Sequence, residues 1–323
     1  MRIDENLALL RSDPAPQRLA QARLEQAKAA WLGQGPGRPF LRELHAYAEG
    51  RALNELPSLL RTVRKGGAAR AFVADLTDAI LPVLRAQPLG LVPFRHQLTA
   101  GHGVMELARS GRAALSLIAY RPAAGAPPAT ACFTSGERHE VCLRGAAAGR
   151  IVGLRTRREG GATLVTRETR LTPDWTGTFD NSRRTKLVDG VSHSLVILRL
   201  SRDALHPGPA REYRLADGAL VHEAAGDRRD SRRELALAVL GSMERRDALP
   251  AICEAAGAGP AHVRWEAVRQ ALAMDSAAGF ALLTGLAGDP ADELAAPAGV
   301  LRNRLLAAHP GLPAVVEDAP CPA

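Results

Sequence analysis

The stretch Arg138–Gly145, RHEVCLRG, places a histidine, a carboxylate and a thiol side by side. Its apolar residues alternate with polar ones, as they do in a strand with one face in the core and one in water. On this interpretation Val141 and Leu143 are buried, and His139 is solvated at the start of the strand. The polar face consists of Glu140, Cys142 and Arg144. Gly145 then begins a turn. The alternative is a metal site to which His139 or Glu140 contributes a ligand.

Similar strand-like segments lie on both sides of this stretch. They are residues 114–120, 150–154 and 194–200, and Pro/Gly-rich breaks such as 122–128 separate them. Eight or more short strands at intervals of about ten residues predict an antiparallel sandwich or barrel and not alternating βαβ units. We therefore expect a central β domain over residues 91–226.

Helical periodicity flanks this β domain on both sides. Helices are predicted at about 16–31, 39–48, 52–63 and 69–85, which makes residues 1–90 an N-terminal helical segment. Helical patterns return over residues 227–312, and residues 313–323 are expected to be a disordered tail. The sequence thus predicts an α+β multidomain protein.

The C-terminal helices contain an internal repeat. Arg232–Ala236 matches Arg264–Val268 after a shift of 32 residues. The segments Asp247–Pro250 and His262–Ala267 resemble those that open the units of HEAT-like repeats. The resemblance implies stacked helical hairpins that present a surface to a partner.

The opening stretch also resembles part of a known metal motif. Glu140 followed by Leu143–Gly145, with His193 further along, is similar to the motif of the cupin family. In that family two histidines one residue apart, a glutamate and a later histidine hold a divalent metal. Gly136–Arg138 occupies the place of the paired histidines here. The resemblance therefore implies a cupin-like β-sandwich whose metal motif is degenerate.

A different metal set is open to this chain, because distant strands can meet inside a barrel. Its candidate ligands are His96, His102, His139 and His193. Imidazole ligands with open coordination positions suit iron or another divalent metal.

The densest polar cluster of the β domain is a candidate ligand-binding site. Its residues are Asp180, Arg183, Arg184 and Lys186. Guanidinium groups bind phosphate and carboxylate bidentately, so the cluster could clamp an oxyanion. An exposed hairpin loop would have the same composition, and we prefer that interpretation.

Composition sets limits on partners and location. The net charge is +8, but the basic residues are almost all arginine and aromatic residues make up only 4%, which argues against a platform for stacking nucleic-acid bases. The cysteines at 132, 142, 253 and 321 have no CxxC spacing. With no signal peptide pattern and no long apolar run, we expect a cytoplasmic protein with reduced thiols and no membrane association.

Two classes of function follow. The first is a non-catalytic binding or scaffold protein, in which a degenerate cupin-like barrel and helical repeats hold a protein partner or a small ligand. The second is a non-haem metal enzyme with histidine ligands in the barrel. Nucleic-acid binding is a weaker third class, and a homodimer through an exposed sheet edge stays open.

Overall fold

The computed structural model describes residues 13–35, 37–99, 101–122, 126–158 and 160–312. The chain divides between Glu223 and Ala224 into two compact units. The tail predicted at residues 313–323 lies outside the described residues.

The first unit begins with helices, as the periodicity predicts. They are α2 (Ala15–Gly33), α3 (Gly37–Ala48), the short 3-10 helix η1 (Leu53–Glu55), α4 (Pro57–Arg64) and α5 (Gly66–Ala86). Pro57 stands in the first turn of α4, where a missing N–H group costs no hydrogen bond. Phe72, Leu76 and Ile80 recur on one face of α5 and are buried.

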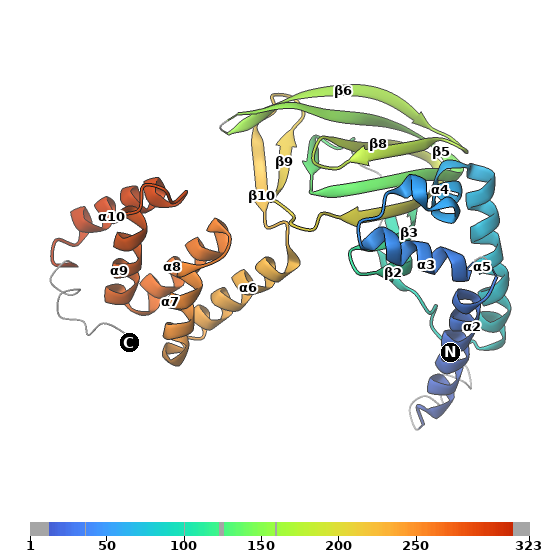
Figure 1. Ribbon diagram of the computed structural model, residues 1–323, viewed down its shortest axis with the longest axis horizontal. Helices are drawn as coiled ribbons and strands as arrows, with labels where there is room; N and C mark the ends of the chain where they lie inside the picture. Colours follow the sequence, from blue (N-terminus) through green and yellow to red (C-terminus); the bar gives the residue numbers. More distant parts are fainter. Residues whose placement is uncertain (1–12, 36, 100, 123–125, 159, 313–323) are drawn as a thin grey trace, which may run out of the picture. The chain divides into compact units, whose positions relative to one another are not determined.

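Two antiparallel sheets follow (Figure 1). The large sheet has the order β1 (Arg95–Leu98), β2 (His102–Ser110), β3 (Ala113–Tyr120), β8 (Arg184–Asp203), β5 (Gly136–Arg158) and β6 (Gly161–Leu171), and β7 (Thr176–Asp180) also pairs with β5. The small sheet consists of β4 (Thr130–Phe133), β9 (Ala210–Arg214) and β10 (Leu220–Ala224). Phe133 and Tyr213 of the small sheet pack with Val152 of the large one. The predicted α+β class with antiparallel sheets is therefore confirmed.

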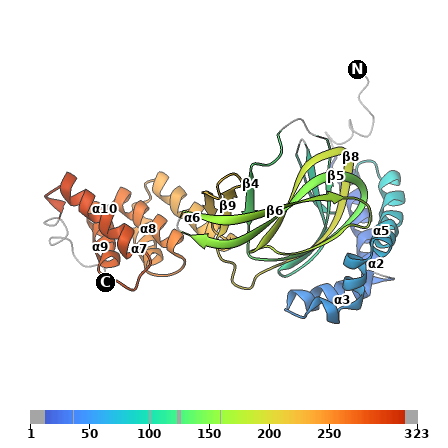
Figure 2. The same cartoon turned by 90° about the horizontal axis from the view of Figure 1, so that it is seen from above.

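Strands β5 and β8 form a long bent ribbon at the centre of the large sheet, visible as curved strands in Figure 2. The ladder shifts register at three places between Cys142 and Gly149, and each shift is a bulge that bends the strands. Gly145 has a φ of 89°, and a Cβ on it would collide with the carbonyl oxygen of Ser194. The prediction that Gly145 begins a turn is wrong, because glycine lets the strand bend and continue.

The helices cover one face of this sheet, which we call the helix face. Val141, Leu143 and Leu198 lie on it and share a core with the helices. The helical contribution includes Phe40, Leu44, Leu59, Phe72 and Leu76. The opposite face carries Cys142, Leu195 and Ile197 and is called the inner face below.

A polar clamp fixes the end of α3 to the sheet. Tyr47 is fully buried and donates its hydroxyl hydrogen to Glu137 Oε1 at 2.8 Å. Arg202 Nη2 lies 2.5 Å from the same oxygen, and Arg202 Nη1 donates to the carbonyl oxygens of Tyr47 and Arg51. The guanidinium of Arg202 also stacks 4.1 Å from the centre of the Tyr47 ring. Arg202 of β8 thereby bonds one carbonyl in the last turn of α3 and one in the segment that follows the helix.

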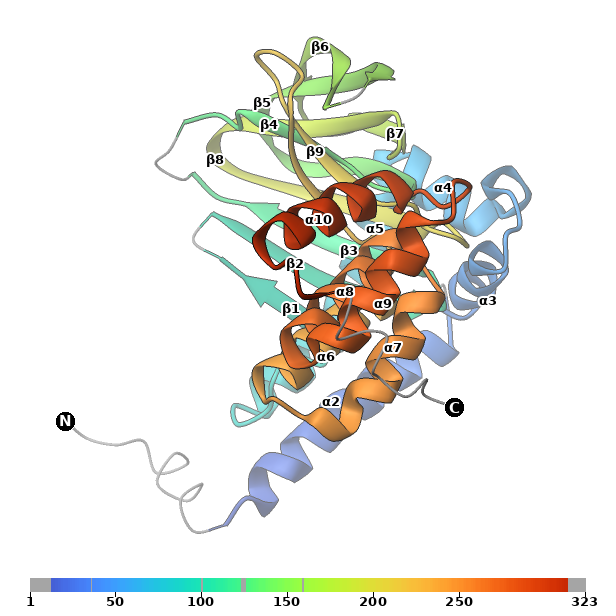
Figure 3. The ribbon, with the colours of Figure 1, turned by 90° about the vertical axis from the view of Figure 1, so that its left-hand side faces the viewer.

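The second unit is all helical (Figure 3). It comprises α6 (Arg228–Ser242), the 3-10 helix η2 (Arg246–Ala248), α7 (Leu249–Gly257), α8 (Ala261–Met274), α9 (Ser276–Ala287) and α10 (Ala295–Ala308). Helix α8 contacts α6, α7 and α9, and α10 packs on α9. Ile252, Phe280 and Leu283 are buried in its core. The HEAT-like assignment of these hairpins stays a prediction.

In the described ranges, no helix combines the length and the apolar character needed to cross a bilayer.

The bend at Gly145 leads to a stability prediction. Gly145→Ala should lower the free energy of unfolding by about 3 kcal/mol or more, because alanine meets both a strained φ and a backbone collision. Gly153→Ala on the same strand is the matched control: a Cβ there would lie 3.7 Å from the nearest atom, Val165 O, and should cost less than about 1 kcal/mol. Urea unfolding of both variants measures the difference, and equal losses would contradict this account of the bend.

Candidate functional site

The inner face carries the polar residues of the stretch that opens β5. Arg138 and Glu140 point to this face, whereas His139 points to the helix face, where Thr178 Oγ1 lies 3.2 Å from its Nδ1. The expectation that His139 and Glu140 are solvated is wrong, since they are 5% and 0% exposed. Arg144 does not share the face of Cys142, because a bulge lies between them.

Glu140 is in contact with three cations. Arg199 of the neighbouring strand β8 donates from Nε to Glu140 Oε1 at 2.7 Å, and its Nη2 is also 2.7 Å away. Lys186 Nζ lies 2.5 Å from Glu140 Oε2, and Arg138 Nε lies 3.4 Å from Oε1. One buried carboxylate therefore stands at the centre of the cluster.

The bent ribbon is what brings two of these cations together. Lys186 and Arg199 are both on β8, and a straight strand would separate them by about 40 Å at roughly 3.3 Å per residue. Both nevertheless reach Glu140, with Arg199 paired directly opposite it and Lys186 opposite Ile151. The cluster thus joins the two arms of the ribbon across the inner face.

Aromatic rings surround the cations. Lys186 Nζ is 5.4 Å from the ring centre of Trp175 and 6.0 Å from that of Tyr120. The guanidinium of Arg138 lies 4.6 Å from the ring centre of Phe179. Ring faces attract cations, and in a site of low polarity this attraction is stronger than in water.

The charges of this cluster do not balance. The side chains of Lys186 and Arg138 are 1% and 14% exposed, and the side chain of Arg199 is 28% exposed, against a single buried carboxylate. Within the described part of the chain, Arg138 Nε, Lys186 Nζ and Glu140 Oε2 are buried without a well-aligned hydrogen bond, although Lys186 Nζ and Glu140 Oε2 lie 2.5 Å apart. The cluster therefore has an excess of positive charge and unfilled donors, and Arg199 gives it a route to solvent.

The pKa shifts follow from this arrangement. Burial would raise the pKa of Glu140, but Lys186, Arg199 and Arg138 outweigh burial and lower that pKa to about 2. Burial lowers the pKa of Lys186 and of Arg138, and the contact with Glu140 opposes this on both. Glu140 is consequently ionised at neutral pH, and its negative charge opposes the loss of a proton from Lys186 and Arg138.

The residues predicted as a ligand clamp do not act together. Asp180 and Arg183 are exposed at the β7–β8 hairpin, where Asp180 Oδ1 accepts hydrogen bonds from the backbone and hydroxyl of Ser182. Arg184 is also exposed, and its guanidinium lies 6.0 Å from the Phe179 ring centre. Only Lys186 turns inward to the cluster.

The four predicted histidine ligands are dispersed. His96 and His193 are exposed, and His102 stacks 5.1 Å from the Tyr120 ring. His139 pairs with Leu200, seven residues along β8 from the exposed His193, and it points to the helix face. Across the described ranges, no three His, Cys, Asp or Glu side chains could hold a metal ion.

Glu140 is also a poor metal ligand in this setting. Its three cationic neighbours would repel a divalent cation. The residues therefore do not fit the metal site of the resemblance, and the iron assignment stays a prediction that no geometry here supports.

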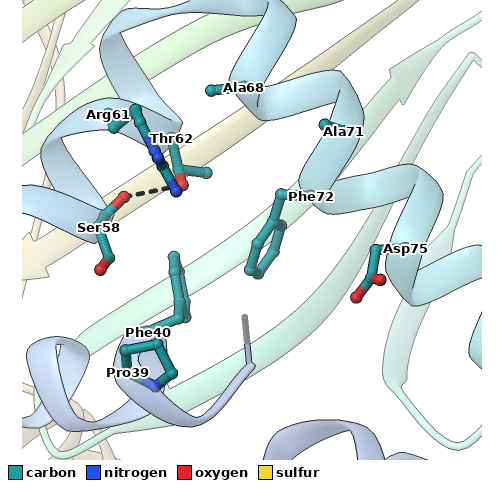
Figure 4. Close-up of a pocket in the computed structure, with 9 residues that line it drawn as sticks. All are labelled: Pro39, Phe40, Ser58, Arg61, Thr62, Ala68, Ala71, Phe72 and Asp75. Carbon is teal, nitrogen blue, oxygen red and sulfur yellow. Dashed lines mark hydrogen bonds between the residues drawn. The ribbon is translucent and has the colours of Figure 1, made fainter. Parts of the chain in front are cut away.

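Two pockets lie away from the cluster. One, of about 450 Å³, lies among α3, α4 and α5 against the stacked rings of Phe40 and Phe72 (Figure 4). Two of its polar side chains are already bonded: Thr62 donates to Ser58 O, and Asp75 accepts from Trp31 Nε1.

The other pocket, of about 470 Å³, adjoins Arg150, which donates to both carboxylate oxygens of Asp189 and to Pro128 O. In both pockets the polar groups named are paired. Neither has the unfilled donors of the Glu140 cluster.

Sequence reasoning did not identify Arg138, Arg199 or the three aromatic residues of the cluster as site residues. Arg199 interrupts the apolar strand Ser194–Leu200, and an arginine within such a strand is a signal that it has a buried partner. Tyr120 and Trp175 gave no signal, because single aromatic residues are usually part of a core.

The charge imbalance predicts unequal effects of two substitutions. Glu140→Gln should lower the free energy of unfolding by about 3–5 kcal/mol, because it leaves three cations uncompensated. Lys186→Met should cost less than about 2 kcal/mol, because Glu140 keeps two arginines and the methionine keeps the ring contacts. Denaturant unfolding at pH 7 gives both values. A larger loss of stability for Lys186→Met than for Glu140→Gln would show that the cluster has no excess of positive charge.

The lowered pKa of Glu140 predicts a dependence of stability on pH. Its folded pKa of about 2 lies below the unfolded value, so the stabilisation is complete above about pH 5 and is lost as pH falls towards 2. The shift corresponds to something on the order of 3 kcal/mol. Between pH 5 and pH 2 the wild type should therefore lose more stability than Glu140→Gln. Parallel curves would mean that Glu140 is not held ionised in the folded protein.

Comparison with known proteins adds little to the site. No protein-family model matches the chain, and no curated protein matches it. Vicilin from Capsicum annuum is 14% identical over 38% of this chain, with a TM-score of 0.27, and this chain spans 33% of its length.

Two bacterial structures are similarly distant. A cupin superfamily protein from Desulfitobacterium hafniense is 13% identical over 33% of this chain and 83% of its own, with a TM-score of 0.23. A sugar phosphate isomerase of the cupin superfamily from Silicibacter pomeroyi is 8% identical over 42% of this chain and 90% of its own, with a TM-score of 0.27. Matched solved structures are thus cupin-superfamily proteins over about a third of the chain. Similarity at this level supports no argument about activity or ligands.

Proposed function

We propose that the β domain is a non-catalytic binding module that holds a small organic anion on the inner face of the large sheet. One observation supports it above all others: three cations converge on one buried carboxylate, and among the described residues none of the three has a second carboxylate within ion-pair distance. Carboxylate and phosphate groups accept hydrogen bonds from guanidinium and ammonium groups.

A purely structural role explains this cluster less well. A structural ion pair needs one cation for each carboxylate, as Arg150 and Asp189 illustrate elsewhere in the same domain. Each further buried cation adds a desolvation cost of several kcal/mol, and no second described carboxylate pairs with these cations to offset it. An anion bound beside Lys186 and Arg138 would remove this imbalance.

The rigidity of the surroundings also favours binding. Lys186 is confined by the rings of Trp175 and Tyr120, and Arg138 donates to Thr185 Oγ1 at 3.2 Å. Donors that are already held in place lose little conformational entropy when a ligand arrives.

The experiment is isothermal titration of the full chain with benzoate, inorganic phosphate and phenyl phosphate. At least one of these anions should bind with one-to-one stoichiometry, and Lys186→Met should weaken it at least about tenfold, the loss of one charged hydrogen bond. Arg183→Met is the matched control, since Arg183 lies on the same hairpin but its side chain is 80% exposed, and it should bind as the wild type does.

Two results would contradict the proposal. If none of the anions binds, the cluster is structural. If Arg183→Met loses as much affinity as Lys186→Met, the anion binds at the exposed hairpin and not on the inner face.

A further inference from the structure

We infer that the ligand of the inner face carries two negative charges on a single group, as a phosphate monoester does. This inference rests on the proposed function, because it names the class of anion that the cluster would hold.

The number of charges comes from the described side chains. The cations are Arg138, Lys186 and Arg199, and the carboxylate is Glu140. They leave an excess of two positive charges. On β2, Glu106 and Arg109 form an ion pair at 2.6 Å and add no net charge, while Arg184 adds a further cation at the edge. A ligand must carry two negative charges to neutralise the three cations and Glu140 together.

The position of the cations selects between kinds of dianion. All three lie within 3.4 Å of an oxygen of Glu140, so the excess charge is concentrated at one point. A dicarboxylate carries its two charges on separate groups, and a sulfate ester or a monocarboxylate carries only one. A phosphate monoester carries both on one tetrahedral group with three acceptor oxygens. Those oxygens suit the unfilled Arg138 Nε and Lys186 Nζ.

The organic part of the ester would lie against aromatic side chains. The Lys186 ammonium is 5.4 Å from the ring centre of Trp175 and 6.0 Å from that of Tyr120. A group joined to a phosphate beside Lys186 therefore meets ring faces, and a flat substituent gains stacking contacts there. Phenyl phosphate combines these features and is the natural probe.

Titration of the other groups near the cluster would not by itself weaken phosphate binding between pH 7.5 and pH 5. Burial raises the pKa of Tyr120 on β3 and of Cys132 on β4, so both stay neutral below pH 8. Burial, and then Arg199, lowers the pKa of His102 on β2. Any protonation of His102 in acid would add positive charge and strengthen anion binding, which is opposite to the loss expected when the phosphate gains a proton.

The test compares phenyl phosphate with phenyl sulfate, which has nearly the same shape and a single charge at every pH used. At pH 7.5 phenyl phosphate should bind the full chain about tenfold more tightly, the effect of one additional charged contact. At pH 5 the phosphate is a monoanion, because its second pKa is about 6, and the two affinities should agree within about twofold. Lys186→Met should remove most of the preference at pH 7.5.

The outcomes separate this inference from the proposed function. If both ligands bind equally at pH 7.5 and Lys186→Met weakens both, the inner face binds an anion, but the inference that it selects a doubly charged group is wrong. If the preference persists at pH 5, charge is not its cause and the inference fails. If neither ligand nor any other anion binds, the proposed function fails and the inference with it.

Discussion

The ionised carboxylate of Glu140 is the constraint on which the inner face depends. It is fully buried, and it neutralises part of a cationic cluster drawn from both arms of the bent β5–β8 ribbon. Without it, Lys186 and Arg199 would repel each other across that face, and the bend at Gly145 would bring like charges together. The bend of the sheet therefore depends on Glu140, because this carboxylate offsets the repulsion between the cations that the bend brings together.

The helix face of β5 packs against the helices, and its inner face carries the charged cluster. On the helix face, Val141 and Leu143 join the core, and Glu137 is held by Tyr47 and Arg202. These contacts on the helix face hold the strand in place. A strand fixed in this way presents Arg138 and Glu140 at defined positions, so the site obtains its order from the packing of the helices on the opposite face.

Sequence patterns predicted the architecture better than the site. Alternation around Val141 and helical periodicity around Phe72 indicated β and α elements, because burial of apolar side chains repeats with the backbone. The burial of Glu140 had no such signal, since a glutamate in a strand is usually on the wet face. Lys186 was expected to lie with Arg183 in a polar cluster of the hairpin. Its inward turn depends on Glu140, 46 residues earlier in the chain.

The resemblance to the cupin metal motif also indicated the right residue for a different reason from the real one. The resemblance to the cupin family drew attention to Glu140, and the carboxylate stands at the centre of a cluster whose other charged members are cations. In a metal site a carboxylate supplies negative charge to a cation. Here three cations already surround it, so what the face lacks is negative charge. Since a buried site attracts ligands opposite in sign to its own excess, guanidinium and ammonium groups around a carboxylate favour an anion, whereas imidazoles beside a carboxylate favour a cation.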